Sequence, residues 1–246
     1  MVTINYYLQE NMSKPTSFQG YVTNYSSTFI SLSDGVHQGT YYGSFTYGTH
    51  VNGIISSYDG YVNGELSGNA SGLNISIKTL NSYAGKIFGL YKYILSGNDS
   101  INGSNFDDIL LGFKGDDNII GRGGDDNIGG DLGNDTLTGG EGADRFIFNS
   151  KLNKNFNVDT ITDFETGVDK IVLQSSLFKK LGGSVTTDEI WFKDLGDTQT
   201  KSEYLVFESS AGTLSYDADA NGKSMPIKIA IIGVNIDLQS TDLLIA

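Results

Sequence analysis

The sequence of 246 residues has no cysteine, two prolines and two histidines. Without cysteine, the chain has no disulfide framework, no thiolate metal site and no cysteine nucleophile. No apolar run approaches the ~20 residues that span a bilayer, so we expect no membrane span. The N-terminal residues have no basic region followed by an apolar stretch, so we expect no signal peptide. A net charge of −13 argues against a basic face that binds nucleic acid.

The sequence also has few candidates for catalysis. It contains neither the H-E-x-x-H motif of zinc proteases nor the G-x-S-x-G motif of lipases. Its two histidines, His37 and His50, are interpreted as loop residues rather than ligands of a haem or a metal. These absences lean against an enzyme.

Charge and glycine are concentrated in the middle of the chain. Residues 96–150 hold 11 acidic and 3 basic residues, a net charge of −8, together with 13 of the 32 glycines. Residues before 96 are balanced, with 4 acidic and 4 basic residues, and hold 12 of the 14 tyrosines. These differences in composition predict three segments, at residues 1–95, 96–148 and 149–246.

The middle segment repeats with a nine-residue period. Five units open with glycine, a partial unit precedes them, and the sixth position is always aspartate: Asp99, Asp108, Asp117, Asp126, Asp135 and Asp144. The eighth position is always apolar: Ile101, Leu110, Ile119, Ile128, Leu137 and Phe146. Glycine permits tight turns that aim carbonyls inward, and each apolar triplet predicts a short strand. Carboxylate and carbonyl oxygens are the ligands that Ca²⁺ prefers.

The pattern G-G-x-G-x-D-x-U-x resembles the repeat of RTX (haemolysin-type) calcium-binding proteins. The resemblance implies a mostly all-β fold around a parallel β-roll, in which two units complete one turn. It also implies about four Ca²⁺ ions between units n and n+2, along one column with Asp99, Asp117 and Asp135 and another with Asp108, Asp126 and Asp144. Backbone carbonyls would complete the sites, from Gly97, Gly103, Gly112, Lys114, Gly115, Gly121, Gly123, Gly124, Gly130, Leu132, Gly133, Gly139, Glu141 and Gly142.

One unit departs from this pattern. It reads Gly103-Ser104-Asn105-Phe106, with phenylalanine where the fourth-position glycine is expected. Either the calcium site at this turn is the least secure of the four, or Phe106 caps the open end of the roll.

The segment 149–246 resembles the β-rich cap that follows the roll in serralysin-type proteins. Its aspartates are turn and edge residues, or they add one or two calcium sites, with Asp159, Asp163 and Asp169 in one group and Asp217, Asp219 and Asn221 in the other. The acidic and aliphatic residues 240–246 resemble the uncleaved signals of type I secreted proteins. That resemblance implies the type I secretion machinery as a partner and an extracellular location.

Residues 1–95 predict a β-rich module of antiparallel strands with tight turns. Apolar residues at helical spacing then predict an amphipathic helix over 80–95, which we expect to cover the first turn of the roll. The tyrosines indicate either a face that binds a protein or a glycan, or ordinary packing across strands.

These patterns favour a secreted, non-catalytic calcium-binding protein with an N-terminal interaction module for adhesion or surface binding. Four Ca²⁺ ions would bring a charge of +8 and neutralise the middle segment, so we expect the roll to fold on Ca²⁺ binding after export. The alternative is a polysaccharide-modifying enzyme, or an accessory module or fragment of a larger RTX toxin or enzyme. An enzyme would need convergent carboxylates, of which residues 1–95 offer only Glu10, Asp34, Asp59 and Glu65.

Overall fold

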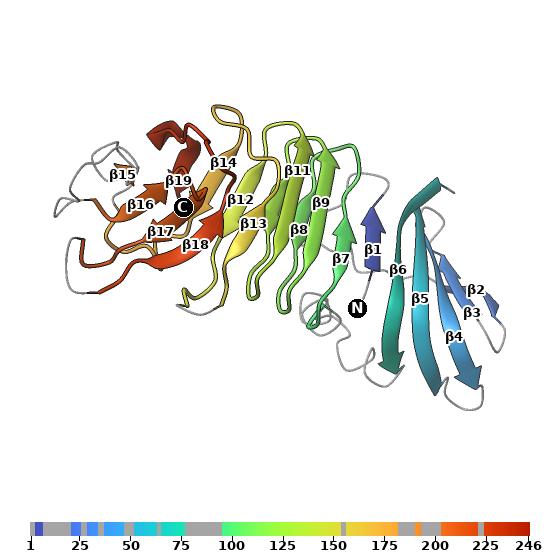
Figure 1. The fold of residues 1–246 in the computed structure, drawn as a ribbon. Coiled ribbons are helices and arrows are strands. Elements are labelled where there is room, and N and C mark those ends of the chain that lie inside the picture. Colours follow the sequence, from blue (N-terminus) through green and yellow to red (C-terminus); the bar gives the residue numbers. More distant parts are fainter. Residues whose placement is uncertain are drawn as a thin grey trace.

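The computed structural model describes residues 3–6, 21–25, 29–33, 37–46, 52–62, 65–76, 95–153, 156–181, 190–192, 203–220 and 224–246. These residues form β-strands in two sheets, with one short 3₁₀ helix (Figure 1). The mostly all-β fold expected from the sequence is therefore confirmed. The helix predicted over 80–95 lies outside the described residues, apart from Leu95.

Two stacks of parallel strands form the roll. The first contains β7 (Ser100–Asn102), β9 (Asn118–Gly123), β11 (Thr136–Glu141) and β13 (Asp159–Ile161). The second contains β8 (Ile109–Leu111), β10 (Asn127–Gly129), β12 (Arg145–Phe148) and β14 (Lys170–Leu173). The chain alternates between the stacks, so two consecutive units make one turn of a parallel β-roll.

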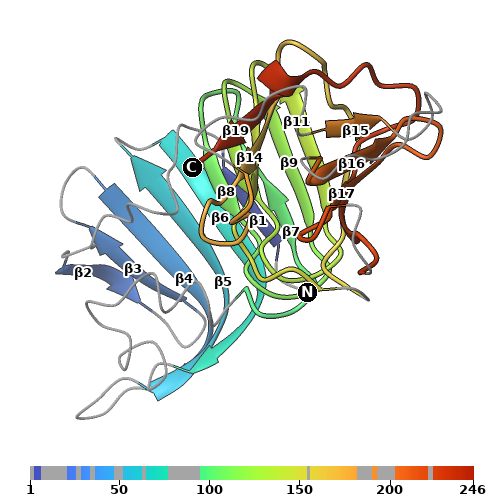
Figure 2. The ribbon, with the colours of Figure 1, turned by 90° about the vertical axis from the view of Figure 1, so that its left-hand side faces the viewer.

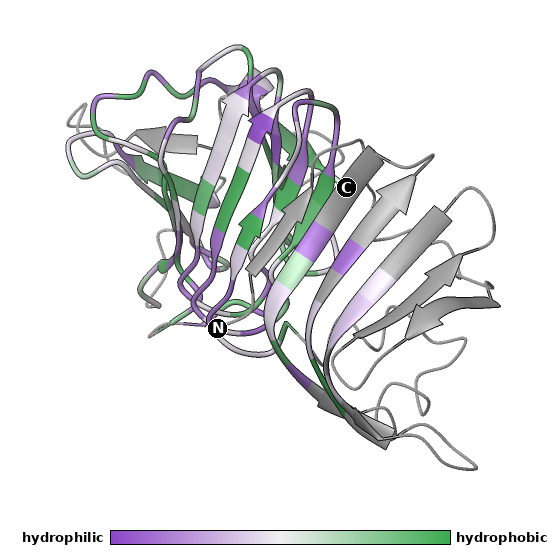
Figure 3. Ribbon diagram, turned by 90° about the vertical axis from the view of Figure 1, so that its right-hand side faces the viewer, coloured by the Kyte–Doolittle hydropathy of each residue, from purple (hydrophilic) through white to green (hydrophobic). Residues whose placement is uncertain are grey.

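The interior of the roll consists of two columns of apolar side chains. Each strand contributes the residue at the eighth position of its unit, because neighbouring side chains of a strand point to opposite faces. The strand register aligns Ile101, Ile119, Leu137 and Ile161 in one stack and Leu110, Ile128, Phe146 and Ile171 in the other. All eight side chains are buried. Figure 3 shows hydrophobic segments within the strands and hydrophilic segments at the bends.

The C-terminal strands extend both stacks. Strand β18 (Ile227–Ile231) pairs in parallel with β13, and β19 (Leu243–Ile245) pairs in parallel with β14. A meander of β16 (Leu205–Glu208), β17 (Thr213–Tyr216) and β18, with β15 (Ile190–Phe192) beside β16, completes this end. The phenol ring of Tyr216 meets Phe178 edge to face at 5.1 Å, which fills the space between the meander and the roll.

The N-terminal strands extend the first stack at its other end (Figures 1 and 2). The strand β1 (Thr3–Tyr6) pairs in parallel with β7 and antiparallel with β6 (Glu65–Ser76). Antiparallel pairing continues outward through β5 (Asn52–Val62), β4 (His37–Thr46), β3 (Phe29–Ser33) and β2 (Tyr21–Tyr25). The first stack is therefore part of a 14-stranded sheet that includes the whole N-terminal meander.

The strand register also continues across this junction. It places Ile4 opposite both Ile101 and Ala70, and Ala70 is buried. The strands predicted in residues 1–95 thus belong to the same sheet as the first stack of the roll. None of the helices within the described ranges is long and apolar enough to cross a bilayer.

We expect Phe146→Ala to lower the free energy of unfolding by about 3–5 kcal/mol, because it leaves a cavity in a column whose neighbours are held by strand pairing. Arg145→Ala is the matched control, because Arg145 is the exposed residue next to Phe146. Denaturant unfolding at saturating Ca²⁺ measures both variants. Equal losses in the two would contradict a packed interior at this position.

Candidate calcium-binding site

The repeat aspartates form two buried columns, one along each edge of the roll. Each aspartate stands two residues before an interior apolar residue, at the point where the turn enters the strand. All six side chains predicted from the repeat are buried, and the columns continue into the C-terminal segment through Asp159 and Asp169, which are also buried. The roll therefore carries acidic side chains inside both of its edges.

After the first aspartate of each column, one oxygen of every column carboxylate ties its turn to the preceding turn on the same edge. In the first column, the backbone N–H groups of Asp99, Asp117 and Asp135 donate to Oδ1 of the next aspartate at 2.8, 2.7 and 3.2 Å. In the second column, the N–H groups of Asp108, Asp126 and Asp144 do the same at 2.7, 2.9 and 3.0 Å. The last acceptors are Asp159 and Asp169, so these two residues complete the columns.

The second oxygen behaves differently. The Oδ2 atoms of Asp117, Asp126, Asp135 and Asp144 are buried and accept no hydrogen bond from any described residue. A buried carboxylate oxygen without a donor or a cation is strongly unfavourable, because the charge has lost its hydration. These four oxygens need positive charge from outside the chain.

A backbone carbonyl from the next turn converges on the same space. A Cβ placed on Gly112 would overlap Oδ2 of Asp117 and would lie 2.8 Å from the carbonyl oxygen of Gly130. The first glycine of the next unit on the other edge, Gly121, faces Oδ2 of Asp126 and the carbonyl oxygen of Gly139 in the same way. Only glycine leaves this space open, and what it opens is lined by hard oxygen donors of the kind that bind Ca²⁺.

The turns have a repeating backbone conformation. The second position has a positive φ at Phe113 (69°), Arg122 (83°), Asp131 (67°) and Gly140 (107°). The fourth position has a positive φ at Gly115, Gly124, Gly133 and Gly142. Left-handed residues on both sides of the third position reverse the direction of successive peptide units, which brings carbonyls to face the neighbouring turn.

The predicted carbonyl ligands lie in these turns. Some of these carbonyl oxygens face the fourth-position glycine of the following unit on the same edge, namely those of Gly97, Gly115 and Gly124. Others face the first-position glycine of the preceding unit on the same edge, namely those of Gly121, Gly130 and Gly139. Among third-position residues, Lys114 and Leu132 form a β-bridge, whereas Gly123 and Glu141 are paired within β9 and β11. The N–H of Gly115 donates to the carbonyl of Leu132 at 2.9 Å.

Burial and mutual repulsion disfavour the charged form of the column carboxylates. Loss of hydration raises the pKa of Asp117 to about 8 and that of Asp126 to about 7, and charge repulsion from the neighbouring column aspartates adds to both shifts. Burial likewise raises the pKa values of Asp135 and Asp144 to about 6 and that of Asp159 to about 8. A bound cation would reverse these shifts.

A second, exposed set of hydrogen bonds reinforces each edge. The side-chain oxygen at the fifth position accepts the backbone N–H of the fifth residue in the following unit on the same edge. The N–H of Asp116 donates to Asn98 at 3.0 Å, and that of Asn134 donates to Asp116 at 2.8 Å. On the other edge, Asp125 and Ala143 donate to Asp107 and Asp125, both at 2.9 Å. These bonds run opposite in direction to those of the buried columns, so each turn is held from both sides.

The C-terminal candidates divide into two kinds. Asp159 and Asp169 join the buried columns, whereas Asp163 is exposed and accepts the N–H groups of Gly139 and Gly140 at 3.0 and 2.9 Å. The sequence contained a signal for the first kind, because Asp159 and Asp169 precede Ile161 and Ile171 by two residues, as in every repeat unit. Asn157 and Gly167, both with positive φ, take the fourth position in these units.

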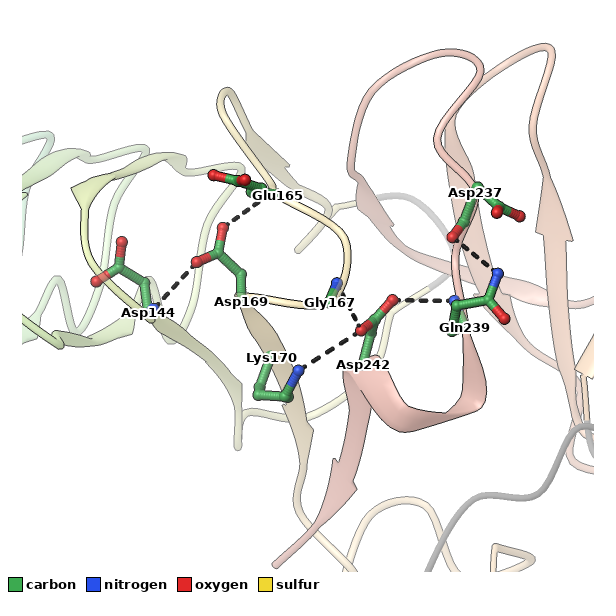
Figure 4. Close-up of polar contacts among 8 residues, drawn as sticks. All are labelled: Asp144, Glu165, Gly167, Asp169, Lys170, Asp237, Gln239 and Asp242. Carbon is green, nitrogen blue, oxygen red and sulfur yellow. Dashed lines mark hydrogen bonds and ion pairs between the residues drawn. The ribbon is translucent and has the colours of Figure 1, made fainter.

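The end of the second column is tied to the short 3₁₀ helix η3 (Ser240–Asp242), which directly precedes β19 (Figure 4). Oδ2 of Asp169 accepts the N–H of Glu165 at 2.8 Å, so Asp169 is held from two sides. In the same turn, the N–H of Gly167 donates to the buried Asp242 at 3.0 Å, and the ammonium of Lys170 lies 3.5 Å from the same oxygen. The residues resembling a secretion signal are thus folded against the last turn of the roll.

The other C-terminal group of candidates, Asp217, Asp219 and Asn221, includes two aspartates that lie in a hydrogen-bonded turn. Asp217 is buried and its Oδ1 accepts the N–H of Asp219 at 3.3 Å, while Oδ2 of Asp219 accepts the N–H of Ser224 at 3.1 Å. The third member, Asn221, lies outside the described residues. No group of three or more His, Cys, Asp or Glu side chains converges as a metal cluster within the ranges that the structure describes.

The comparisons with known proteins cover this region. The family described as Peptidase M10 serralysin C terminal matches residues 91–245. No curated protein matches the chain.

Two solved structures are similar, both from the Azotobacter vinelandii mannuronan C5-epimerase. The AlgE6R3 subunit is 24% identical, with a TM-score of 0.41, over 61% of this chain and 78% of that one. The AlgE6R2 subunit is 26% identical, with a TM-score of 0.34, over 60% of this chain and 92% of that one. At TM-scores below 0.5, neither likeness supports a conclusion. The family match, in contrast, spans more than half of the chain, and the protein therefore belongs to the serralysin C-terminal family and carries a calcium-binding RTX module.

Proposed function

We propose that this protein is a secreted, non-catalytic calcium-binding protein whose roll folds when Ca²⁺ fills its edges outside the cell. The observation that supports this most directly is the set of buried Oδ2 atoms that have no donor among the described residues. In a compartment with little free Ca²⁺, the columns repel themselves and the repeat segment stays open. Extracellular modules bind Ca²⁺ with Kd values of about 10⁻⁴–10⁻³ M, so millimolar Ca²⁺ would fill the sites.

The candidate sites, of which not all need hold an ion, are given by pairs of aspartates that follow one another along a column. Four pairs lie within the repeats: Asp99 with Asp117, Asp117 with Asp135, Asp108 with Asp126, and Asp126 with Asp144. Two more pairs reach into the C-terminal segment, Asp135 with Asp159 and Asp144 with Asp169. When bound, Ca²⁺ would supply the positive charge that these carboxylates need, while the turn carbonyls named above would complete the coordination.

Removal of calcium tests the folding proposal. We expect far-ultraviolet circular dichroism to show a large loss of β signal after chelation and its recovery at millimolar Ca²⁺, because ions that bind only the folded state stabilise it by mass action. Asp126→Asn should bind fewer ions and need a higher Ca²⁺ concentration for half-maximal folding. The matched control is Asp107→Asn, which changes an exposed carboxylate on the same edge. An unchanged β signal after chelation would overturn the proposal.

The calcium-free protein should recover β structure as the pH falls. The pKa values of Asp117 and Asp126 are about 8 and about 7 in the fold, against ~3.9 in an unfolded chain. The folded state therefore binds more protons over this window, so its stability is greatest near pH 4 and is lost as the pH rises towards 8. We expect a stronger β signal at pH 5 than at pH 8 in protein stripped of metal by a chelating resin. A signal that rises with pH would contradict this.

We also propose that type I machinery exports the chain. Membership of the serralysin C-terminal family supports this, as does the resemblance of residues 240–246 to type I signals. Co-expression with a type I exporter of a serralysin should place the protein in the medium, and the same exporter with an inactive ATPase should not. Equal amounts in the medium in both cases would exclude this route.

The N-terminal meander is proposed to be the part that binds an extracellular protein or glycan. Its charge balance and its tyrosines support this, as does its place at the end of the shared sheet, away from the aspartate columns. Glycan arrays and capture from cell surfaces test the proposal when they are done with the full chain in Ca²⁺, since β1 pairs with both parts. Binding that survives replacement of residues 21–76 would locate the interaction elsewhere.

A further inference from the structure

The first complete turn of the second column, residues 103–106, is closed by its own donors. Ser104 is buried, and its backbone N–H donates to Oδ2 of Asp108 at 2.6 Å. The hydroxyl of Ser104 lies 2.9 Å from the same oxygen. Two donors from one residue therefore converge on the carboxylate oxygen that would face an ion.

The hydroxyl is placed for this by the turn itself. The N–H of Phe106 donates to Oγ of Ser104 at 3.1 Å, so Oγ already accepts one hydrogen bond. Its single hydroxyl hydrogen has two acceptors in reach, Oδ2 of Asp108 at 2.9 Å and the carbonyl oxygen of Phe106 at 3.4 Å, and the charged and nearer carboxylate is the stronger acceptor. Phe106 does not cap the interior, since its side chain is 53% exposed. The turn is thus a local hydrogen-bonded loop in which serine bridges two positions.

The later turns differ in conformation and in the state of this oxygen. Their second and fourth positions have positive φ, whereas Ser104 and Phe106 are not among the described residues with positive φ. The Oδ2 atoms of Asp117, Asp126, Asp135 and Asp144 accept no hydrogen bond from the described residues, but that of Asp108 accepts two. Among these five repeat aspartates, the departure from the repeat therefore coincides with the one whose second oxygen the protein satisfies by itself.

The space beside Asp108 otherwise matches the other sites. A Cβ on Gly103 would lie 2.9 Å from Oδ2 of Asp108 and would overlap the carbonyl oxygen of Gly121. The difference is that an N–H and an O–H point at the oxygen that an ion would share. The positive ends of these bonds would repel a cation at short range, and displacing them would cost a buried hydrogen bond each.

We propose that Ser104 takes the place of a calcium ion between Asp108 and Asp126, so that the roll binds one ion fewer than its aspartate pairs would allow. This inference rests on the proposed function, because it assumes that the remaining pairs bind Ca²⁺. Two neutral donors satisfy one oxygen here, whereas a divalent cation does so for the aspartates whose second oxygen has no donor in the described part of the chain. The N–H and O–H groups of Ser104 thus do what the ion does elsewhere, so this turn is expected to bind no Ca²⁺ rather than to bind it weakly.

Counting bound ions by native mass spectrometry at saturating Ca²⁺ tests the inference. If the wild-type protein binds n ions, Asp108→Asn should also bind n, because the amide oxygen still accepts from Ser104. Asp117→Asn is the matched variant in the other column and should bind fewer than n. Loss of an ion in Asp108→Asn would overturn the inference, and binding of no ions by the wild type would instead overturn the proposed function.

A gain-of-site variant tests it from the other direction. Ser104→Gly combined with Phe106→Gly removes the hydroxyl and allows a positive φ at the second and fourth positions, as in the later turns, and we expect n+1 ions. Asn105→Ala, in the same turn, should still bind n ions. A folded double variant that binds n ions would contradict the inference. If the double variant does not fold, as judged by circular dichroism in Ca²⁺, the Asp108→Asn and Asp117→Asn counts decide the question alone.

Discussion

The structure depends on negative charge that is buried where the protein supplies few donors. Along each edge of the roll, one carboxylate oxygen per turn holds the neighbouring backbone while the other faces a space that glycine keeps open. Water cannot hydrate these oxygens once the turns have stacked, and four of the eight column aspartates have no donor for the second oxygen in the described part of the chain. The compact roll is therefore an incomplete structure until cations complete it.

Packing and charge neutralisation are inseparable in this arrangement. An interior residue such as Ile128 lies on β10, two residues after Asp126, which directly precedes that short strand. The strand therefore cannot place one without placing the other. Apolar burial favours the stacked turns, while the desolvated carboxylates oppose them. Because apolar burial and carboxylate desolvation nearly offset each other, the free energy added by a bound ion decides whether the roll is folded. The fold therefore responds to the concentration of that ion.

The nine-residue repeat was sufficient to predict the short strands and their interior apolar residues, and its resemblance to the RTX pattern implied the parallel roll and the two columns of repeat aspartates. It was not sufficient to find where the columns end. Successive column aspartates are 18 residues apart within the repeats, but Asp159 follows Asp135 by 24 residues and Asp169 follows Asp144 by 25. The role of Ser104 depends on a backbone conformation that no pattern of residue types encodes. The position of β1 depends on a pairing between the start of the chain and β7, which local propensity does not report.

The placement of β1 has a consequence for the order in which the molecule assembles. Ile4 can pair with Ile101 only after the intervening chain has closed into a long loop, and closing such a loop is entropically unfavourable unless the partner strand is already in place. The first strand of the roll is thus the strand against which the amino-terminal sheet pairs. An ion that orders the turns beside β7 would then also favour pairing as far as the edge strand β2, nine strands away from β13 in the same sheet.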